Sequence, residues 1–209
     1  LDFIDNAVEP SYGPIPKNIF FLTADAFGVL PPISRLTPGQ AMFHFISGYT
    51  AKVAGTEAGI TEPKTTFSAC FGAVFLPLHP TTYAEMLGEK MRKHEVKVWL
   101  INTGWTGGPY GIGNRMKLSY TRAMITAALN GELENVEYDQ HRVFGLAMPR
   151  TCPNVPSEIL SPRYAWANKD VYDQKANELA EAFNANFSKY ADKANAEILA
   201  GAPKPVVNS

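Results

Sequence analysis

The chain has 209 residues, of which 45% are hydrophobic and 19% charged, as is usual for a globular protein. Its 19 lysines and arginines nearly balance 20 aspartates and glutamates, so the formal net charge is −1. This balance argues against a surface built to neutralise nucleic-acid phosphates or anionic lipid, and no apolar run reaches the ~18 residues of a membrane span. We therefore expect neither nucleic acid nor membrane as a partner.

The two cysteines, Cys70 and Cys152, lie far apart and form no Cys-x-x-Cys pair. Free thiols in a reducing compartment are the simpler interpretation, which predicts a cytoplasmic protein. The segment from Leu1 to Asp5 has neither a basic region nor an initiator Met, so it is not a signal peptide. It has the character of a chain that begins within a domain.

The first predicted elements are a strand and a helix. The apolar run 18–23 is typical of a strand buried on both faces. Thr37 and Gln40 form a capping-box pattern around Pro38, which predicts the start of a helix. Apolar residues at spacings of three and four extend this helix to Val53, and Gly55 is expected to end it.

Residues 55–66 are polar and interrupted by glycine and proline, which indicates a loop of the length typical of an active-site lid. Residues 67–78, rich in Phe and small residues, are expected to be buried. A second capping-box pattern at Thr82 and Glu85 predicts another helix, and residues 96–102 predict a second strand.

The C-terminal half alternates in the same way. We expect an extended stretch over 115–120, a helix over 121–130 stopped by Gly131, a strand over 144–148, and a long helix over 170–190 followed by a frayed tail after Gly201. Interleaved strands and helices predict an α/β fold with a mixed sheet and flanking helices.

The glycine-rich segment 103–113, directly after the second predicted strand, is the main chemical signal. Glycines let a backbone approach a ligand closely, so its amides can face phosphates or a base. No Gly-Lys-Ser/Thr follows, so it is not a Walker A loop, and spacing alone equally describes a tight surface loop. Arg115 favours a ligand, because a guanidinium stacks on purines and pairs with phosphate. The Thr121 hydroxyl could simply cap the helix that begins there.

Other polar residues carry weaker signals. Arg35, after two prolines, could bind a phosphate or carboxylate or form a buried salt bridge. The four histidines show no metal-ligand spacing, and the acidic residues form no evident acid/base pair. The residues alone therefore indicate an α/β protein with a possible anion or nucleotide loop.

Three long motifs are more specific. The segments 20–37 (FFLTADAFGVLPPISRLT), 48–72 (from GYTAKVAGTE to FSACFG) and 102–122 (from NTGW to RMKLSYTR) resemble ATP-dependent phosphoenolpyruvate carboxykinases, in the family's order. The resemblance extends from about residue 4 to residue 203. It implies that residues 1–209 are a C-terminal fragment of the family's nucleotide-binding domain.

The resemblance also implies a reaction, in which oxaloacetate and ATP give phosphoenolpyruvate, CO2 and ADP, a lyase step of gluconeogenesis. ATP and Mn²⁺ or Mg²⁺ would be the cofactors. The metal ligands, the P-loop and the substrate arginines would lie upstream of Leu1, in the N-terminal part of the same enzyme. This chain would then hold no catalytic or metal-binding residue and be inactive alone.

Residue by residue, the resemblance assigns ATP binding to Arg115, Met116 and Thr121. Arg115 would lie along the adenine or ribose, Met116 would pack on the base, and Thr121 would hold the edge of the pocket. It also makes the 55–66 loop, with Thr56 and Glu57, a lid over the substrate. The alternative is a non-catalytic binding module that kept the fold without the active site.

Overall fold

The computed structural model of the chain describes residues 4–5, 7–9, 12–52 and 62–206. Its centre is a five-stranded sheet in the order β1-β5-β2-β9-β8. β1 and β5 are parallel, whereas β2, β9 and β8 join by antiparallel pairing, so the predicted α/β fold with a mixed sheet is confirmed. These strands are β1 (Asn18–Thr23), β2 (Ile33–Leu36), β5 (Lys97–Asn102), β8 (Tyr138–Gln140) and β9 (Ala147–Pro149).

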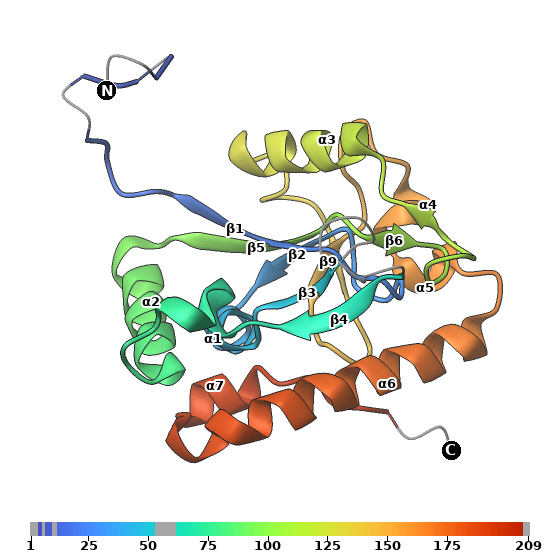
Figure 1. Cartoon of the computed structure of the whole chain (residues 1–209). Helices are drawn as coiled ribbons and strands as arrows, with labels where there is room; N and C mark the ends of the chain where they lie inside the picture. Colours follow the sequence, from blue (N-terminus) through green and yellow to red (C-terminus); the bar gives the residue numbers. More distant parts are fainter. Residues whose placement is uncertain (1–3, 6, 10–11, 53–61, 207–209) are drawn as a thin grey trace.

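Helices cover both faces of the sheet (Figure 1). α3 lies on one face, and α1, α2, α6 and α7 lie on the other. The helices are α1 (Pro38–Ser47), α2 (Pro80–His94), α3 (Leu118–Leu129), α4 (Ser157–Leu160), α5 (Pro162–Ala165), α6 (Lys169–Phe187) and α7 (Ala196–Ala200). Short 3-10 turns are η1 (Ala69–Phe71), η2 (Ala73–Phe75) and η3 (Ser188–Lys193).

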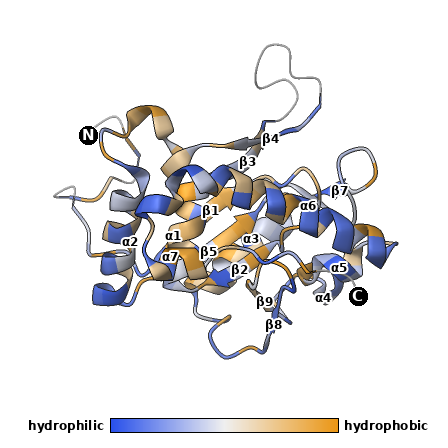
Figure 2. Ribbon diagram, turned by 90° about the horizontal axis from the view of Figure 1, so that it is seen from below, coloured by the Kyte–Doolittle hydropathy of each residue, from blue (hydrophilic) through white to orange (hydrophobic). Residues whose placement is uncertain are grey.

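β5 shows how the two faces divide the core. Val98 and Leu100 join the large cluster under α1 and α6, whereas Trp99 and Ile101 join the smaller cluster under α3, because successive side chains of a strand point to opposite faces. All four are at most 2% exposed. Figure 2 shows the hydrophobic residues concentrated where the strands meet α1.

β1 lies at one edge of this sheet. The strand over 18–23 was predicted correctly, but its burial on both faces was wrong, because Leu22 is 57% exposed. The 67–78 segment also differs from expectation. Val74 and Phe75, both on the turn η2, are 88% and 83% exposed.

Two helix boundaries reflect capping. The capping box at Thr37 is present in full, with both Thr37–Gln40 hydrogen bonds, which confirms the predicted start of α1. α2 instead begins at Pro80, with His79 as its N-cap and its Nδ1 accepting from the Thr81 N–H. The N-cap predicted at Thr82 was therefore three residues too late, nearly one turn.

Two small hairpins stand beside the main sheet. β3 (Tyr49–Lys52) pairs with β4 (Lys64–Phe67), and β6 (Trp105–Thr106) pairs with β7 (Asn114–Arg115). The first hairpin corrects two predictions, since residues 49–52 leave α1 and residues 64–66 leave the predicted loop. Residues 53–61, which include Thr56 and Glu57, lie outside the described part of the chain.

Candidate functional site

The glycine-rich segment after β5 forms the β6–β7 hairpin. Gly107, Gly108 and Gly111 have φ values of 73°, 152° and 85°, a range that favours glycine. A side chain at Gly104 would collide with the backbone of Asp25, which shows how closely this loop packs on the end of β1. The strand–glycine arrangement predicted for 96–113 is thus present, with the loop held against the carboxyl ends of β1 and β5.

Arg115 is the exposed cation of this hairpin. Its Nε donates to the Thr103 carbonyl oxygen at 3.1 Å, and its guanidinium carbon lies 5.2 Å from the centroid of the Trp105 ring. The Thr103 carbonyl oxygen and the Trp105 ring therefore hold the guanidinium on one side and leave its other side open. Its remaining N–H groups and its face can meet a planar or anionic ligand.

Met116 is the residue after Arg115, Thr121 lies five residues further on, and both are 7% exposed. The Met116 N–H donates to the Gly104 carbonyl oxygen at 2.7 Å, so Met116 is tied to the glycine loop. Thr121 lies inside the first turn of α3, whose N-cap is Lys117. The expected capping role of Thr121 was wrong, because the helix starts three residues earlier.

Arg35 lies in β2, and its side chain contacts Tyr138 rather than the β6–β7 hairpin. It is exposed, and its guanidinium carbon stacks 4.5 Å above the Tyr138 ring on the α3 side of the sheet. A buried salt bridge for Arg35 is therefore wrong. Its stacking on Tyr138 accounts for its position without a ligand.

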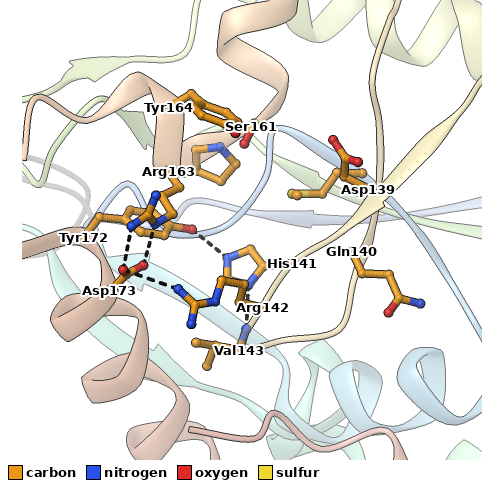
Figure 3. A pocket seen from close by; sticks show the side chains of 12 residues that line it. Asp139, Gln140, His141, Arg142, Val143, Ser161, Arg163, Tyr164, Tyr172 and Asp173 are labelled. Carbon is orange, nitrogen blue, oxygen red and sulfur yellow. Dashed lines mark hydrogen bonds and ion pairs between the residues drawn. The ribbon is translucent and has the colours of Figure 1, made fainter. Parts of the chain in front are cut away.

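A cavity with a volume of about 360 Å³ lies elsewhere in the structure (Figure 3). β8, the 141–143 turn, α5 and the start of α6 line it. Arg163 pairs with Asp173 through two hydrogen bonds of 2.9 Å, and Arg142 approaches the same carboxylate at 3.7 Å. Arg163 accordingly lowers the pKa of Asp173.

His141 forms the floor of this cavity, and its hydrogen bonds define its tautomer. Nδ1 accepts from the Val143 and Phe144 N–H groups at 3.3 and 3.2 Å, so the proton sits on Nε2, 2.7 Å from the Tyr172 hydroxyl. That hydroxyl donates to the Val29 carbonyl oxygen at 3.0 Å. Burial lowers the pKa of His141 to about 4.

The cavity is thus polar but internally satisfied. Its second carboxylate, Asp139, accepts from Arg150 at 2.8 Å, so both lining carboxylates have arginine partners. Arg115, Met116 and Thr121 do not line it. The sequence pattern around residues 139–173 contained no spacing that would have marked it.

Two polar residues beside the hairpin, Asp25 and Asn102, were not predicted as site residues from the sequence motifs. Both are fully buried; Asp25 lies two residues after β1, and Asn102 is the last residue of the parallel strand β5. Burial raises the pKa of Asp25, opposed by hydrogen bonds from Leu30, Phe27, Tyr49 and Val29. Their position after two apolar strands was the available signal, because carboxyl ends of parallel strands meet at one edge.

The described residues contain neither a metal-binding cluster nor a membrane-spanning helix. Within residues 4–5, 7–9, 12–52 and 62–206, no three His, Cys, Asp or Glu side chains gather as a metal site. The side chains in these ranges therefore do not fit a catalytic metal. Among the same residues, every helix is too short or too polar to cross a bilayer.

Comparison with known proteins identifies the family. The family model of phosphoenolpyruvate carboxykinase matches residues 1–158. Phosphoenolpyruvate carboxykinase (ATP) of Flavobacterium johnsoniae is 74% identical over 200 residues, and that of Christiangramia forsetii is 66% identical over 203. The enzyme of Thermus thermophilus is 57% identical over 201 residues.

The matches cover most of this chain but a minor part of each relative. They span 96%, 97% and 96% of the chain and 38% of each of these three relatives. The region matched by the family model includes β5, the glycine hairpin with Arg115, and α3. The chain belongs to the ATP-dependent phosphoenolpyruvate carboxykinase family.

Proposed function

We propose that this chain is the adenine-side part of an enzyme that converts oxaloacetate and ATP into phosphoenolpyruvate, CO2 and ADP. Its relatives carry the name phosphoenolpyruvate carboxykinase (ATP), and the chain spans about 38% of their length. The proposed enzyme therefore includes a further part that supplies the phosphate cradle, the oxaloacetate site and the ligands for Mn²⁺ or Mg²⁺. When bound, such a metal stabilises enolate and phosphate charge.

The observation that carries this proposal is the oriented guanidinium of Arg115. It is exposed, held by the Thr103 carbonyl oxygen and stacked beside Trp105. In the proposed site the Arg115 plane lies along the adenine or ribose. Because the guanidinium is already held on one side, little side-chain entropy is lost when the nucleotide binds.

Met116 and Thr121 have supporting roles in this proposal. Both are nearly buried, so each offers a small contact area to the base. Met116 packs beneath the base through its thioether, which adapts to irregular surfaces. Thr121, one turn further in α3, sets the edge of the pocket.

Residues 55–63 of the predicted 55–66 loop remain our proposed lid over the substrate, since residues 64–66 belong to β4. The chain that follows, from Lys64, pairs in the β3–β4 hairpin. That hairpin is joined to the end of β1, since the Thr23 hydroxyl donates to the Tyr49 carbonyl oxygen at 2.7 Å. The base of this hairpin therefore lies beside the carboxyl edge of the sheet, where open α/β sheets bind ligands.

Replacing Arg115 with Ala tests the adenine assignment in a full-length carboxykinase that contains this segment. We expect R115A to raise KM for ATP about tenfold, the loss of roughly 1.4 kcal/mol, with KM for oxaloacetate almost unchanged. Steady-state kinetics with each substrate varied in turn measure both constants. R92A is the matched control, because Arg92 is exposed on α2 and pairs with Glu197 at 2.9 Å.

Equal increases in both Michaelis constants would contradict the adenine-side role of Arg115. Absence of any carboxykinase turnover by the full-length protein would instead support the non-catalytic alternative. These two failures are distinguishable, since the first concerns one residue and the second the whole reaction.

A further inference from the structure

Asn102, the last residue of β5, joins three backbone segments through one buried side chain. Its Oδ1 accepts from the N–H groups of Asp25 and Gly104 at 3.0 and 2.8 Å. Its Nδ2 donates to the Leu30 carbonyl oxygen at 2.9 Å. The residue is 0% exposed, so water cannot replace these partners, and each group left unpaired would be costly.

Asp25 lies opposite Asn102, two residues beyond the end of β1. Its backbone carbonyl oxygen accepts from the Trp105 N–H at 2.8 Å. Its carboxylate accepts from the Tyr49 hydroxyl at 2.8 Å and from the Val29 and Leu30 N–H groups at 2.7 and 2.8 Å. The end of β1, the base of the β3–β4 hairpin and the glycine loop are therefore joined at one buried point.

The loop that Asn102 holds is the loop that holds Arg115. Gly104, whose N–H is bound by Asn102, offers its carbonyl oxygen to the Met116 N–H at 2.7 Å. The neighbouring Thr103 carbonyl oxygen accepts from Arg115 Nε at 3.1 Å. A displacement of residues 103–104 would consequently move both side chains.

We infer that Asn102 is a positioning residue for nucleotide binding, acting through residues 103–104 on Arg115 and Met116. This inference rests on the proposed function, because it assigns Asn102 to the adenine-side site. Asn102 does not itself reach a ligand, since it is fully buried. It acts by fixing backbone atoms whose displacement by about 1 Å is enough to weaken a binding site.

The test compares N102A and N102D in a full-length carboxykinase that contains this segment. N102A removes the acceptor for both N–H groups, so we expect KM for ATP to rise about tenfold while KM for oxaloacetate stays within about twofold. N102D keeps an oxygen at the Oδ1 position. Because its second oxygen faces the Leu30 carbonyl oxygen in place of the Nδ2 donor, it should recover only part of the ATP affinity that N102A loses, whereas a general loss of stability would not change KM for ATP selectively.

Asn177 provides a matched control in the same enzyme. Its side chain also accepts from one backbone N–H and donates to one carbonyl, both of Val206 and both at 2.9 Å, between α6 and the C-terminal tail. N177A should therefore lower the melting temperature without a selective change in KM for ATP. If N102A does not fold, N102S replaces it, because its shorter hydroxyl cannot reach Gly104 and Leu30 together.

The inference is overturned if N102A, or N102S in its place, changes both Michaelis constants equally or changes neither. The R115A result separates this failure from failure of the proposed function. Selective loss of ATP affinity in R115A without any in the Asn102 variants removes only the positioning role. Absence of selectivity in R115A removes the adenine-side site itself.

Discussion

His44 and His141 show how strongly burial acts on single residues of this chain. His44 is 3% exposed in α1, with its ring 5.5 Å from that of Phe183, and His141 is 4% exposed beside Tyr172. Burial lowers the pKa of each imidazole from 6.5 to about 4. Both are therefore neutral at physiological pH.

This burial predicts a stability that depends on pH. The folded pKa of each histidine lies below its unfolded value, so the unfolded chain binds more protons as pH falls from 6.5 towards 4. Unfolding free energy should then decrease across that window, by on the order of 3 kcal/mol per histidine. Denaturant titrations at several pH values measure the decrease.

H44F provides the matched variant for this measurement. Phe keeps the aromatic contacts with Phe43 and Phe183 but cannot titrate. The slope of stability against pH between 6.5 and 4 should become smaller, because one of the two histidine protons linked to unfolding is removed. An unchanged slope would show that His44 does not contribute.

The end of α1 and the start of β3 are set at Gly48, which lies between them. The apolar spacing predicted a helix to Val53, but α1 ends at Ser47 and Gly48 takes a left-handed conformation with φ of 52°. A side chain at Gly48 would collide with the Ser68 carbonyl oxygen. Tyr49 therefore leaves the helix and pairs with Phe67 in β3–β4.

Replacing Gly48 with Ala should destabilise the protein by more than the ~1 kcal/mol cost of a left-handed alanine. The extra cost comes from the collision with Ser68, which separates the base of the β3–β4 hairpin from α1. Urea unfolding measures the difference. G13A is the control, because nothing lies within 4 Å of the corresponding position, and equal effects of the two changes would refute this explanation.

At the scale of the whole molecule, the C-terminal tail contacts segments that are distant from it in the sequence. The tail after Gly201, expected to fray, is held through Val206. Asn177 forms two hydrogen bonds of 2.9 Å with the Val206 backbone, and Lys204 N–H donates to the Val143 carbonyl oxygen at 2.8 Å. Residues 202–206 thus pack along α6, so a composition rich in proline was a poor guide to the order of this part of the tail.

The size of the chain relative to its family predicts weak nucleotide binding in isolation. The chain spans about 38% of its relatives, and under the proposed function the phosphate-binding residues lie in the remainder. Because phosphate contacts supply much of a nucleotide's binding energy, the isolated chain should bind ATP weakly or not at all. Titration calorimetry that gave a micromolar Kd would contradict the proposed division of the site.

Several features of this protein could be predicted from its sequence because neighbouring residues determine them. The Thr37–Gln40 capping box, the apolar strands at 18–23 and 97–102 and the buried stripe of α6 each depend on contacts or periodicity within a few residues. The family resemblance, carried by three long motifs, is confirmed by the match over residues 1–158. The ligand roles of Arg115, Met116 and Thr121 stay predictions.

Only the tertiary structure decided how these pieces meet. The hydrogen bond from Asp25 N–H to Asn102 joins residues 77 positions apart, and a pattern within a window of a few residues contains no information on such a pair. The same holds for the end of α1 at Gly48, which depends on the distant Ser68 carbonyl. Local hydrogen bonds and periodicity depend on residues close together in the sequence, so the sequence determines them directly. The partners of buried polar groups depend instead on which strand ends the sheet brings together.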